Sequence, residues 1–201
     1  MDYTKVKEAL EARGFAVTVC PSKEIASAYL NEMIDGTSVG FGGSMTLKEM
    51  GLFSSLSRHN KVYSHWNTPE WRTGAEVLAD AAHAEVFLSS VNGLAETGEI
   101  INIDGTGNRV ASTLYGHKKV YFVVGRNKIA ATYDDALWRA RNIASPKNAR
   151  RLGVKTPCAA KGDKCYDCKS PERICRALVV LWEAVKSCEM EVVLVDEDLG
   201  Y

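Results

Sequence analysis

Four cysteines that lie close together are the strongest chemical signal in the sequence. They are Cys158, Cys165, Cys168 and Cys175, in the spacing C-x6-C-x2-C-x6-C. A C-x2-C pair lets two thiolates reach one metal from a tight turn, and flanking cysteines can complete a set of four soft ligands. Structural zinc usually takes two well-separated C-x2-C pairs, whereas one compact run with Pro157 beside an end cysteine is more typical of iron–sulfur ligation. The spacing favours a 4Fe-4S cluster, with zinc as the alternative.

Disulfides and unliganded thiols are the competing interpretations of these cysteines. The first residues are charged, with no apolar segment of the kind found in signal peptides, so we expect a cytoplasmic, reducing environment in which disulfides are rare. Unliganded thiols seldom cluster so closely. Several basic residues would offset the charge of four thiolates, namely Lys161, Lys164, Lys169, Arg173 and Arg176. We expect the other two cysteines, Cys20 and Cys188, to pack as small hydrophobic residues.

A glycine-rich segment over residues 40–46 could hold an anion. It follows a predicted strand and opens a predicted helix, so its backbone N–H groups and the helix N-terminus would favour phosphate or carboxylate. It has neither the third glycine of the dinucleotide fingerprint nor the Gly-Lys-Ser/Thr end of a phosphate-binding loop, which argues against a nucleotide. The alternative is an ordinary turn with Ser44 as the N-cap. The candidate ligand-binding residues are Gly42, Gly43, Ser44, Met45 and Thr46.

A second turn-rich segment, residues 92–109, carries the acidic candidates. Glu96 and Glu99 could each be a catalytic nucleophile or base, and Arg109 could clamp a carboxylate or phosphate. The alternative is a hairpin that turns at Asp104 and Gly105, with the glutamates and the arginine solvated or paired to each other, and composition alone slightly favours it. The ligand-binding candidates here are Thr97, Gly98, Gly105, Thr106, Gly107, Asn108 and Arg109.

The elements that must position these segments alternate between helix and strand. This order predicts one α/β domain over residues 1–201, with an open, mostly parallel sheet flanked by helices and a cysteine-rich loop at 156–176. Ligands of such sheets bind at the carboxyl ends of the strands. We expect strands at 15–20, 37–41, 61–64, 85–90, 119–125 and 191–195, and helices at 2–14, 23–33, 46–59, 69–83 and 134–144, with a short one at 110–115.

Composition excludes several classes of partner. The 25 basic and 25 acidic side chains give a formal net charge of zero, so no overall field attracts nucleic acid. No stretch approaches the roughly 18 apolar residues that a membrane helix needs. The four histidines show no metal-binding pairing, so we expect them to be structural. An apolar strand near the C-terminus could form the edge of a homodimer.

Taken in order, four segments resemble the LUD-domain family, which is named for lactate utilisation. They are residues 39–46, 95–100 and 144–152 and the cysteine loop, and the resemblance runs from about residue 3 to residue 201. It implies the fold of the sugar-phosphate isomerase and CoA-transferase superfamily. In that superfamily a glycine-rich strand-to-helix loop holds phosphate or carboxylate, and an acidic residue in a later loop serves as nucleophile or base. The matching positions are residues 42–46, with Glu96 or Glu99.

The resemblance names no reaction, and whether the protein is an enzyme stays open. Larger relatives work in a multi-protein system that oxidises lactate, with iron–sulfur centres carrying electrons. Three hypotheses follow. The first is a glycine-loop site for a small anionic metabolite in lactate or organic-acid metabolism, with the cysteine cluster facing the cleft. The second is an electron-transfer accessory protein that docks on a redox partner, with the cluster away from the glycine loops. The third is a ligand-binding domain with a purely structural zinc site.

Overall fold

Six parallel strands form the central sheet of the computed structural model, which describes residues 2–201. Their order is β1-β10-β7-β4-β2-β3, and every neighbouring pair is parallel. The expectation of an open, mostly parallel sheet flanked by helices is confirmed. The strands are β1 (Ala16–Cys20), β2 (Ser38–Phe41), β3 (Lys61–Tyr63), β4 (Val86–Ser89), β7 (Lys119–Gly125) and β10 (Glu189–Val195).

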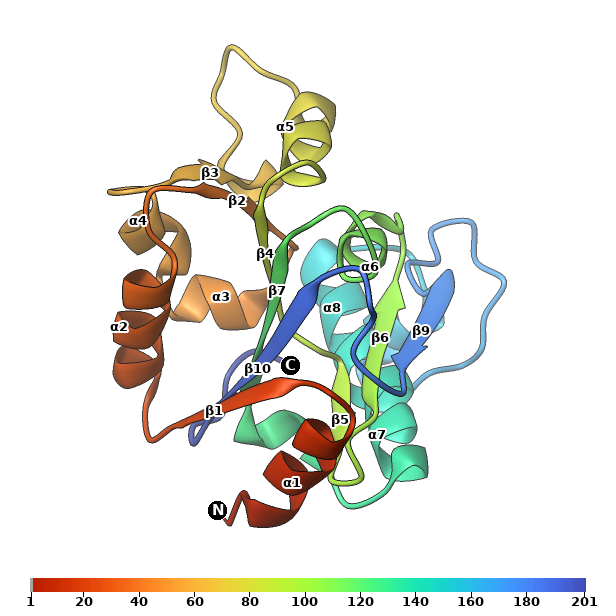
Figure 1. Cartoon of the computed structure of the whole chain (residues 1–201). Coiled ribbons are helices and arrows are strands. Elements are labelled where there is room, and N and C mark those ends of the chain that lie inside the picture. Colours follow the sequence, from red (N-terminus) through yellow and green to blue (C-terminus); the bar gives the residue numbers. More distant parts are fainter. Residues whose placement is uncertain (1) are drawn as a thin grey trace.

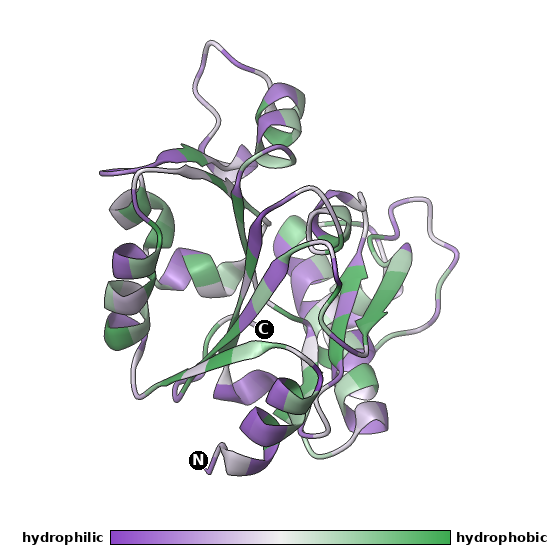
Figure 2. Cartoon of the chain, in the orientation of Figure 1, coloured by the Kyte–Doolittle hydropathy of each residue, from purple (hydrophilic) through white to green (hydrophobic). Residues whose placement is uncertain are grey.

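Both faces of this sheet are covered, which is why its central strands are continuous apolar runs. Alternate residues of β7 enter different cores. Phe122 packs in a cluster with Leu10 of α1 (Thr4–Ala12), while Val123 packs with Leu30 of α2 (Lys23–Met33). Figure 1 shows α2, α3 (Met45–Glu49) and α4 (Leu52–Leu56) on one side of the sheet. Figure 2 shows the apolar strands between the more polar outer helices.

Two helices differ from the sequence expectation because of local backbone geometry. The helix expected at 46–59 is divided into α3 and α4 at Gly51, whose φ of 65° is left-handed. The helix expected from residue 69 is α5 (Gly74–Ala81), which starts after Thr73. The Thr73 hydroxyl accepts from the Glu76 N–H, and the Glu76 carboxylate accepts from the Thr73 N–H, so the two form a capping box.

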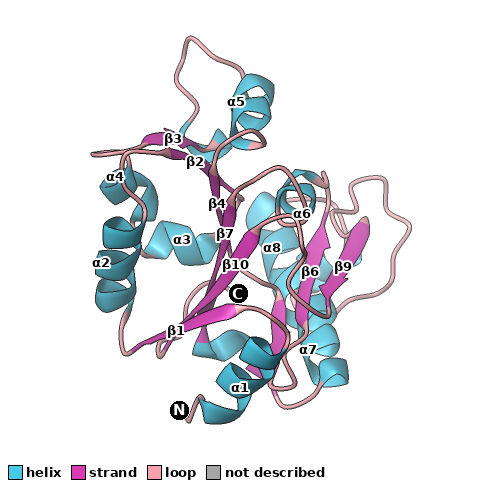
Figure 3. Ribbon diagram, viewed as in Figure 1, coloured by secondary structure: helices cyan, strands magenta, loops and turns pink. Residues whose placement is uncertain are grey.

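A second sheet of four strands, which the sequence did not predict, lies beside the first (Figure 3). Its order is β8-β5-β6-β9. The pairs β5–β6 and β6–β9 are antiparallel, whereas β5–β8 is parallel. The strands are β5 (Gly93–Ala95), β6 (Ile100–Asp104), β8 (Ile129–Ala130) and β9 (Ala177–Leu181).

One long helical segment covers this second sheet. It comprises α7 (Tyr133–Arg139), a π-helical turn at Ala140–Ala144 and α8 (Ser145–Leu152). Ala136 and Ala140 pack against Ala95 and Ile101 of the sheet. We expected the helix to end before Pro146, but the backbone stays helical through it, and the π-helical turn lies directly before the proline-containing turn of α8. The helix therefore extends its polar C-terminal half along the sheet edge.

The remaining elements are short helices and the cysteine-rich segment that precedes β9. The short helix expected at 110–115 is α6 (Asn108–Ser112). Short 3-10 helices lie at His65–Asn67 and Arg126–Lys128. After α8 comes α9 (Pro157–Lys161), and the cysteine-rich segment then runs to the edge strand β9. Among residues 2–201, no helix has the length and apolarity to cross a membrane.

Candidate anion-binding site

A cavity of about 290 Å³ lies where the carboxyl ends of β2, β4 and β7 meet the end of β6. Because these three strands of the central sheet are parallel, the segments that follow them converge at one edge. The cavity brings together parts of both glycine-rich segments with α8 and the last residues of the chain. The polar and glycine residues that line it include Gly43, Ser44, His65, Ser90, Asn92, Asp104, Gly105, Thr106, Asn108, Arg109, Lys128, Ser145, Asn148 and Arg151.

Lys128 is a buried amine in the wall of this cavity. Its side chain follows β7, and the residue is only 4% exposed. Its Nζ donates to the Oγ1 of Thr46 at 2.8 Å and to the Oγ of Ser90 at 2.9 Å. Within residues 2–201 no carboxylate forms an ion pair with it. Burial, and then the nearby Arg139 and Arg109, lower the pKa of Lys128 to about 7.

The last residues of the chain close over Lys128. The Oγ1 of Thr46 donates to the carbonyl oxygen of Leu199 at 3.2 Å, so this hydroxyl is fixed as the acceptor for the lysine. Gly200 has a left-handed φ of 62°, and a Cβ there would lie 2.7 Å from Thr46 Oγ1 and 3.3 Å from Lys128 Nζ. A glycine is therefore required here for the close approach of the backbone.

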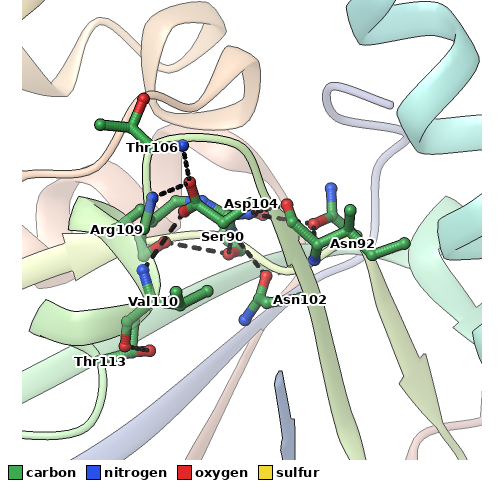
Figure 4. Close-up of polar contacts among 11 residues, drawn as sticks. Ser90, Asn92, Asn102, Asp104, Thr106, Arg109, Val110 and Thr113 are labelled. Atoms are coloured by element: carbon green, nitrogen blue, oxygen red, sulfur yellow. Dashed lines mark hydrogen bonds and ion pairs between the residues drawn. The ribbon is translucent and has the colours of Figure 1, made fainter. Parts of the chain in front are cut away.

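Arg109 holds the cavity wall together (Figure 4). Its Nη1 donates to the Ser90 carbonyl at 3.2 Å and to the Asn102 side chain at 2.5 Å. Its Nη2 donates to the Asn92 side chain at 3.1 Å and to a backbone carbonyl of β6 at 2.7 Å. The guanidinium also pairs with Asp104, with 3.5 Å between Nε and Oδ2. Its N–H groups are therefore used within the protein itself. Arg109 adds positive charge to the cavity, but its guanidinium is not free to clamp the carboxylate or phosphate of a ligand.

Asp104 makes a strand-to-helix turn where the sequence suggested a hairpin. Its Oδ1 accepts from the backbone N–H groups of Thr106 and Gly107 at 3.1 and 2.8 Å, and its Oδ2 accepts from the Val110 N–H at 3.3 Å. A carboxylate in this position satisfies the unpaired N–H groups at the start of α6. The turn therefore directs Arg109 back across the end of β6.

The glycines after β2 are needed for packing. A Cβ at Gly42 would come within 2.9 Å of Arg109 Cγ, and one at Gly43 within 3.3 Å of His65 Cε1. Ser44 is the N-cap of α3, since its Oγ accepts from the Leu47 N–H at 3.3 Å. Gly43, Ser44 and Met45 line the cavity, whereas Gly42 does not.

Two further polar side chains stand in the cavity with unused hydrogen-bonding capacity. The Nδ1 of His65 is buried and has no hydrogen-bond partner within residues 2–201. Burial lowers the pKa of His65, so the ring is neutral near pH 7. Arg151, from α8, lies 5.1 Å from the ring centroid of Trp66 and donates Nε and Nη2 to Asn148. Its Nη1 has no partner in the described part of the chain.

The structure places Glu96 and Glu99 at the other end of the second sheet. They belong to the β5–β6 turn, together with Thr97 and Gly98, and none of these four residues lines the cavity. The Oε2 of Glu96 lies 2.8 Å from the Nζ of Lys5. Glu99 pairs with Arg13 at 2.6 Å and accepts from the Thr97 hydroxyl. At about 3.3 Å per residue, the length of β6 puts this turn roughly 16 Å from Asp104.

The cysteine loop borders the cavity, but its thiols are not gathered in this structure. Within residues 2–201 no three His, Cys, Asp or Glu side chains form a group that could hold a metal, and all six cysteines are free. Cys165 and Cys175 line a second cavity of about 280 Å³ with three arginines, Arg141, Arg173 and Arg176. This cavity shares Ile103 and Ser145 with the first.

The turn between Cys165 and Cys168 has a compact backbone. Asp167 adopts a left-handed φ of 43°, and its N–H donates to the Cys165 Sγ at 3.3 Å. Arg173 links this turn to Cys175, because it donates to the carbonyl oxygens of Cys168 and Cys175 at 2.8 Å each. Cys158 stands apart at the start of α9, where its Sγ lies 3.3 Å from the Thr156 hydroxyl.

The open parallel sheet defines an α/β domain with a polar cavity at the carboxyl ends of its strands, the place where sheets of this class generally bind their ligands. The family model for the LUD domain matches residues 3–195, and the chain belongs to this family. No curated protein matches it. The fold is similar to the crystal structure of a DUF162 family protein from Deinococcus radiodurans, with a TM-score of 0.52, 14% identity, and coverage of 97% of this chain and 99% of that one.

Sequence reasoning did not find Lys128 or Arg151. Lys128 follows the buried strand β7 directly, in the stretch Gly125-Arg126-Asn127-Lys128. The rule that places ligands at the carboxyl ends of parallel strands could have singled it out. Arg151 lies within the segment 144–152, but only the extension of α8 past Pro146 brings it to the cavity.

Proposed function

We propose that this LUD-domain protein binds a small anionic metabolite, a carboxylate or a phosphate, in the cavity at the ends of β2, β4 and β7, and that it serves lactate or organic-acid metabolism. The observation that carries the proposal is Lys128, a buried amine without a carboxylate partner in residues 2–201. A buried charge is expensive unless it is paired. A bound anion would supply the missing partner and would draw a proton onto Nζ.

The other groups in the cavity fit an anion of limited size. Arg109 and Arg139 lie close enough to Lys128 to lower its pKa, so the base of the cavity is electropositive. At the rim, Arg151 has an Nη1 without a hydrogen-bond partner in residues 2–201. His65 lines the cavity as well, and its Nδ1 is buried without a partner in those residues. A volume of about 290 Å³ suits a small organic acid or sugar phosphate. This agrees with the absence of a dinucleotide fingerprint from the glycine segment.

Ligand-dependent thermal stabilisation tests this proposal. Lactate, citrate, inorganic phosphate and glycerol phosphate are titrated into the wild-type chain and into Lys128→Met and Arg151→Met. Binding raises Tm with ligand concentration, so we expect a rise in the wild type that is reduced in both variants. Arg150→Met is the matched control, because Arg150 is exposed on the same helix and does not line the cavity. If none of these anions stabilises the wild type, the proposal fails.

We also propose that the four cysteines, Cys158, Cys165, Cys168 and Cys175, hold a metal centre, a 4Fe-4S cluster or alternatively zinc. The spacing supports this, and so does the compact turn in which the Cys165 thiol receives a backbone N–H. Thiolates would be the ligands, and the surrounding arginines would offset their charge. The loop would have to draw its thiols together around the metal, since they are separate in this structure.

The position of the loop favours a role beside the ligand cavity over that of a separate docking module for a redox partner, because the two cavities share Ile103 and Ser145. Anaerobic purification followed by iron, sulfide and zinc analysis tests the metal centre. We expect iron and sulfide in the wild type and in Cys188→Ser, which alters a cysteine outside the loop, and their loss in Cys165→Ser. Zinc without iron would favour the structural alternative. A metal-free protein from anaerobic cells would overturn the metal proposal.

A further inference from the structure

Lys128 has the surroundings of a reactive amine as well as those of an anion-binding group. We propose that its Nζ condenses with the carbonyl carbon of a small aldehyde or ketone that carries a carboxylate or phosphate, forming an imine inside the cavity. The inference rests on the proposed function, because it takes the same cavity and the same anionic class of ligand. It narrows that class to molecules with a carbonyl group, and it gives the protein a covalent step.

The two hydrogen bonds of Nζ are both donated by the nitrogen. Thr46 Oγ1 is committed as an acceptor, because its own hydrogen goes to Leu199 O, and Ser90 Oγ accepts the second hydrogen. A neutral amine that donates both of its hydrogens keeps its lone pair free. Lys128 is among the residues that line the cavity, so its side chain borders the space that a ligand would occupy.

Charge around Lys128 favours the neutral, nucleophilic form. A lysine that pairs with a carboxylate stays protonated and unreactive, but Lys128 pairs with none in residues 2–201. Arg139 and Arg109 add two like charges nearby, and with burial they bring the pKa of Lys128 to about 7. A desolvated lysine beside other cations is a known way to activate an amine towards carbonyl compounds. Glu49 acts in the opposite direction, as the weakest influence on this pKa.

The condensation balances without an oxidant or a reductant. The lone pair of Nζ forms a C–N bond while the carbonyl π electrons move to oxygen, and that oxygen takes up the proton that the nitrogen loses. The C–O bond then breaks, water leaves with one further proton from the nitrogen, and a C=N bond remains. Arg151 at the rim has an unpartnered Nη1 for the carboxylate or phosphate of the ligand. His65, whose ring is neutral near pH 7, also lines the cavity.

Reductive trapping tests this step. The wild-type chain is incubated with pyruvate in one arm and dihydroxyacetone phosphate in the other, borohydride is added, and the intact mass and the labelled peptide are measured. We expect one adduct per chain, equal to the ligand minus one oxygen atom, on the peptide that contains Lys128. The arm that yields the adduct tells carboxylate from phosphate. Lys128→Arg should lose the adduct, while Lys147→Arg, which changes an exposed lysine of α8, should keep it.

Mapping the label in the wild type keeps the test valid even if Lys128→Arg does not fold. Label spread over exposed lysines, or no adduct in either arm, would overturn the inference. Lactate, which has no carbonyl group to condense, separates the two proposals. If lactate or inorganic phosphate raises Tm while no adduct forms, imine formation fails and anion binding stands. If no anion, with or without a carbonyl, raises Tm and no adduct forms, both fail.

Discussion

Replacing Lys128 with methionine should change how stability depends on pH. The substitution keeps most of the buried stem and removes the amine. The pKa of Lys128 is about 7 in the folded chain, against an ordinary value of 10.5 for a lysine side chain in the unfolded chain. Between these values the unfolded chain binds a proton that the folded chain does not, so the free energy of unfolding of the wild type rises with pH. The contribution of Lys128 to this free energy is lowest at and below about pH 7, where the folded chain must bury the charge.

The size of this effect follows from the two pKa values. One pKa unit corresponds to about 1.4 kcal/mol, so the fall from 10.5 to about 7 corresponds to roughly 5 kcal/mol across that window. Near neutral pH the methionine variant also loses hydrogen bonds to Thr46 and Ser90, each worth about 1 kcal/mol. The loss of the buried charge outweighs these bonds, so we expect the variant to be the more stable chain at pH 7.

Urea unfolding of both chains over a series of pH values measures this directly. Other groups titrate in the same range, but they are common to both chains and cancel in the difference. We expect the advantage of Lys128→Met to shrink by about 1.4 kcal/mol for each pH unit above about 7. Lys147→Met, at an exposed position, should show no such trend. A constant difference across this range would mean that Lys128 keeps its ordinary pKa, and the case for a neutral amine would fall with it.

Three further substitutions distinguish residues that stabilise the fold from residues that affect ligand binding. Arg109→Met leaves several buried oxygens without a donor and should lower the free energy of unfolding by about 3–5 kcal/mol in urea; a loss below about 1 kcal/mol would contradict the role given to its hydrogen bonds. Gly200→Ala should weaken anion binding, because the added Cβ would lie 2.7 Å from the Oγ1 of Thr46. Gly36→Ala is the control: its φ is similar and its Cβ would meet nothing within 4 Å, so it should only lower Tm. Equal anion affinity in the two variants would refute the role given to Gly200. Glu99→Gln should lower Tm through its ion pair with Arg13 and leave ligand affinity unchanged, and a loss of affinity at equal stability would return this glutamate to the site.

The central sheet could be predicted because its information is local. Continuous apolar runs such as β7 and β10, separated by helical periodicity, identify buried parallel strands without any knowledge of their partners. The second sheet depends on pairing between distant segments, since β6 is bonded to β9 across the whole α7–α8 region. The strands β5 and β8 have only three and two residues, and glycine-containing turns flank β6, so alternation along the sequence gives no clear pattern. Local periodicity therefore indicates the first sheet and not the second.

The candidate site was only partly accessible to sequence reasoning for a related reason. The rule about carboxyl ends of strands correctly points to the segments after β2, β4 and β7. The rule does not apply to an antiparallel hairpin. There, residues that come just before a strand and residues that come just after it lie at opposite ends of the sheet. Residues 92–109 contain such a strand, β6, so the acidic candidate Glu99 precedes it and Arg109 follows it. Because these residues are close in sequence, they suggested a single site, but the fold places them in two separate groups.

The two buried cations of the cavity show why burial alone does not mark a functional group. Arg109 directs its N–H groups at side-chain and backbone oxygens and pairs with Asp104, so its charge and its hydrogen bonds are satisfied by the chain itself. Lys128 has two neutral hydroxyls as acceptors and no carboxylate within residues 2–201. The same substitution by methionine should therefore have opposite effects on stability at neutral pH, with a loss at Arg109 and a gain at Lys128. A chain that keeps a destabilising amine at a cavity has a use for it there. A simple anion would pair with its protonated form, whereas a carbonyl compound would react with the lone pair of its neutral form.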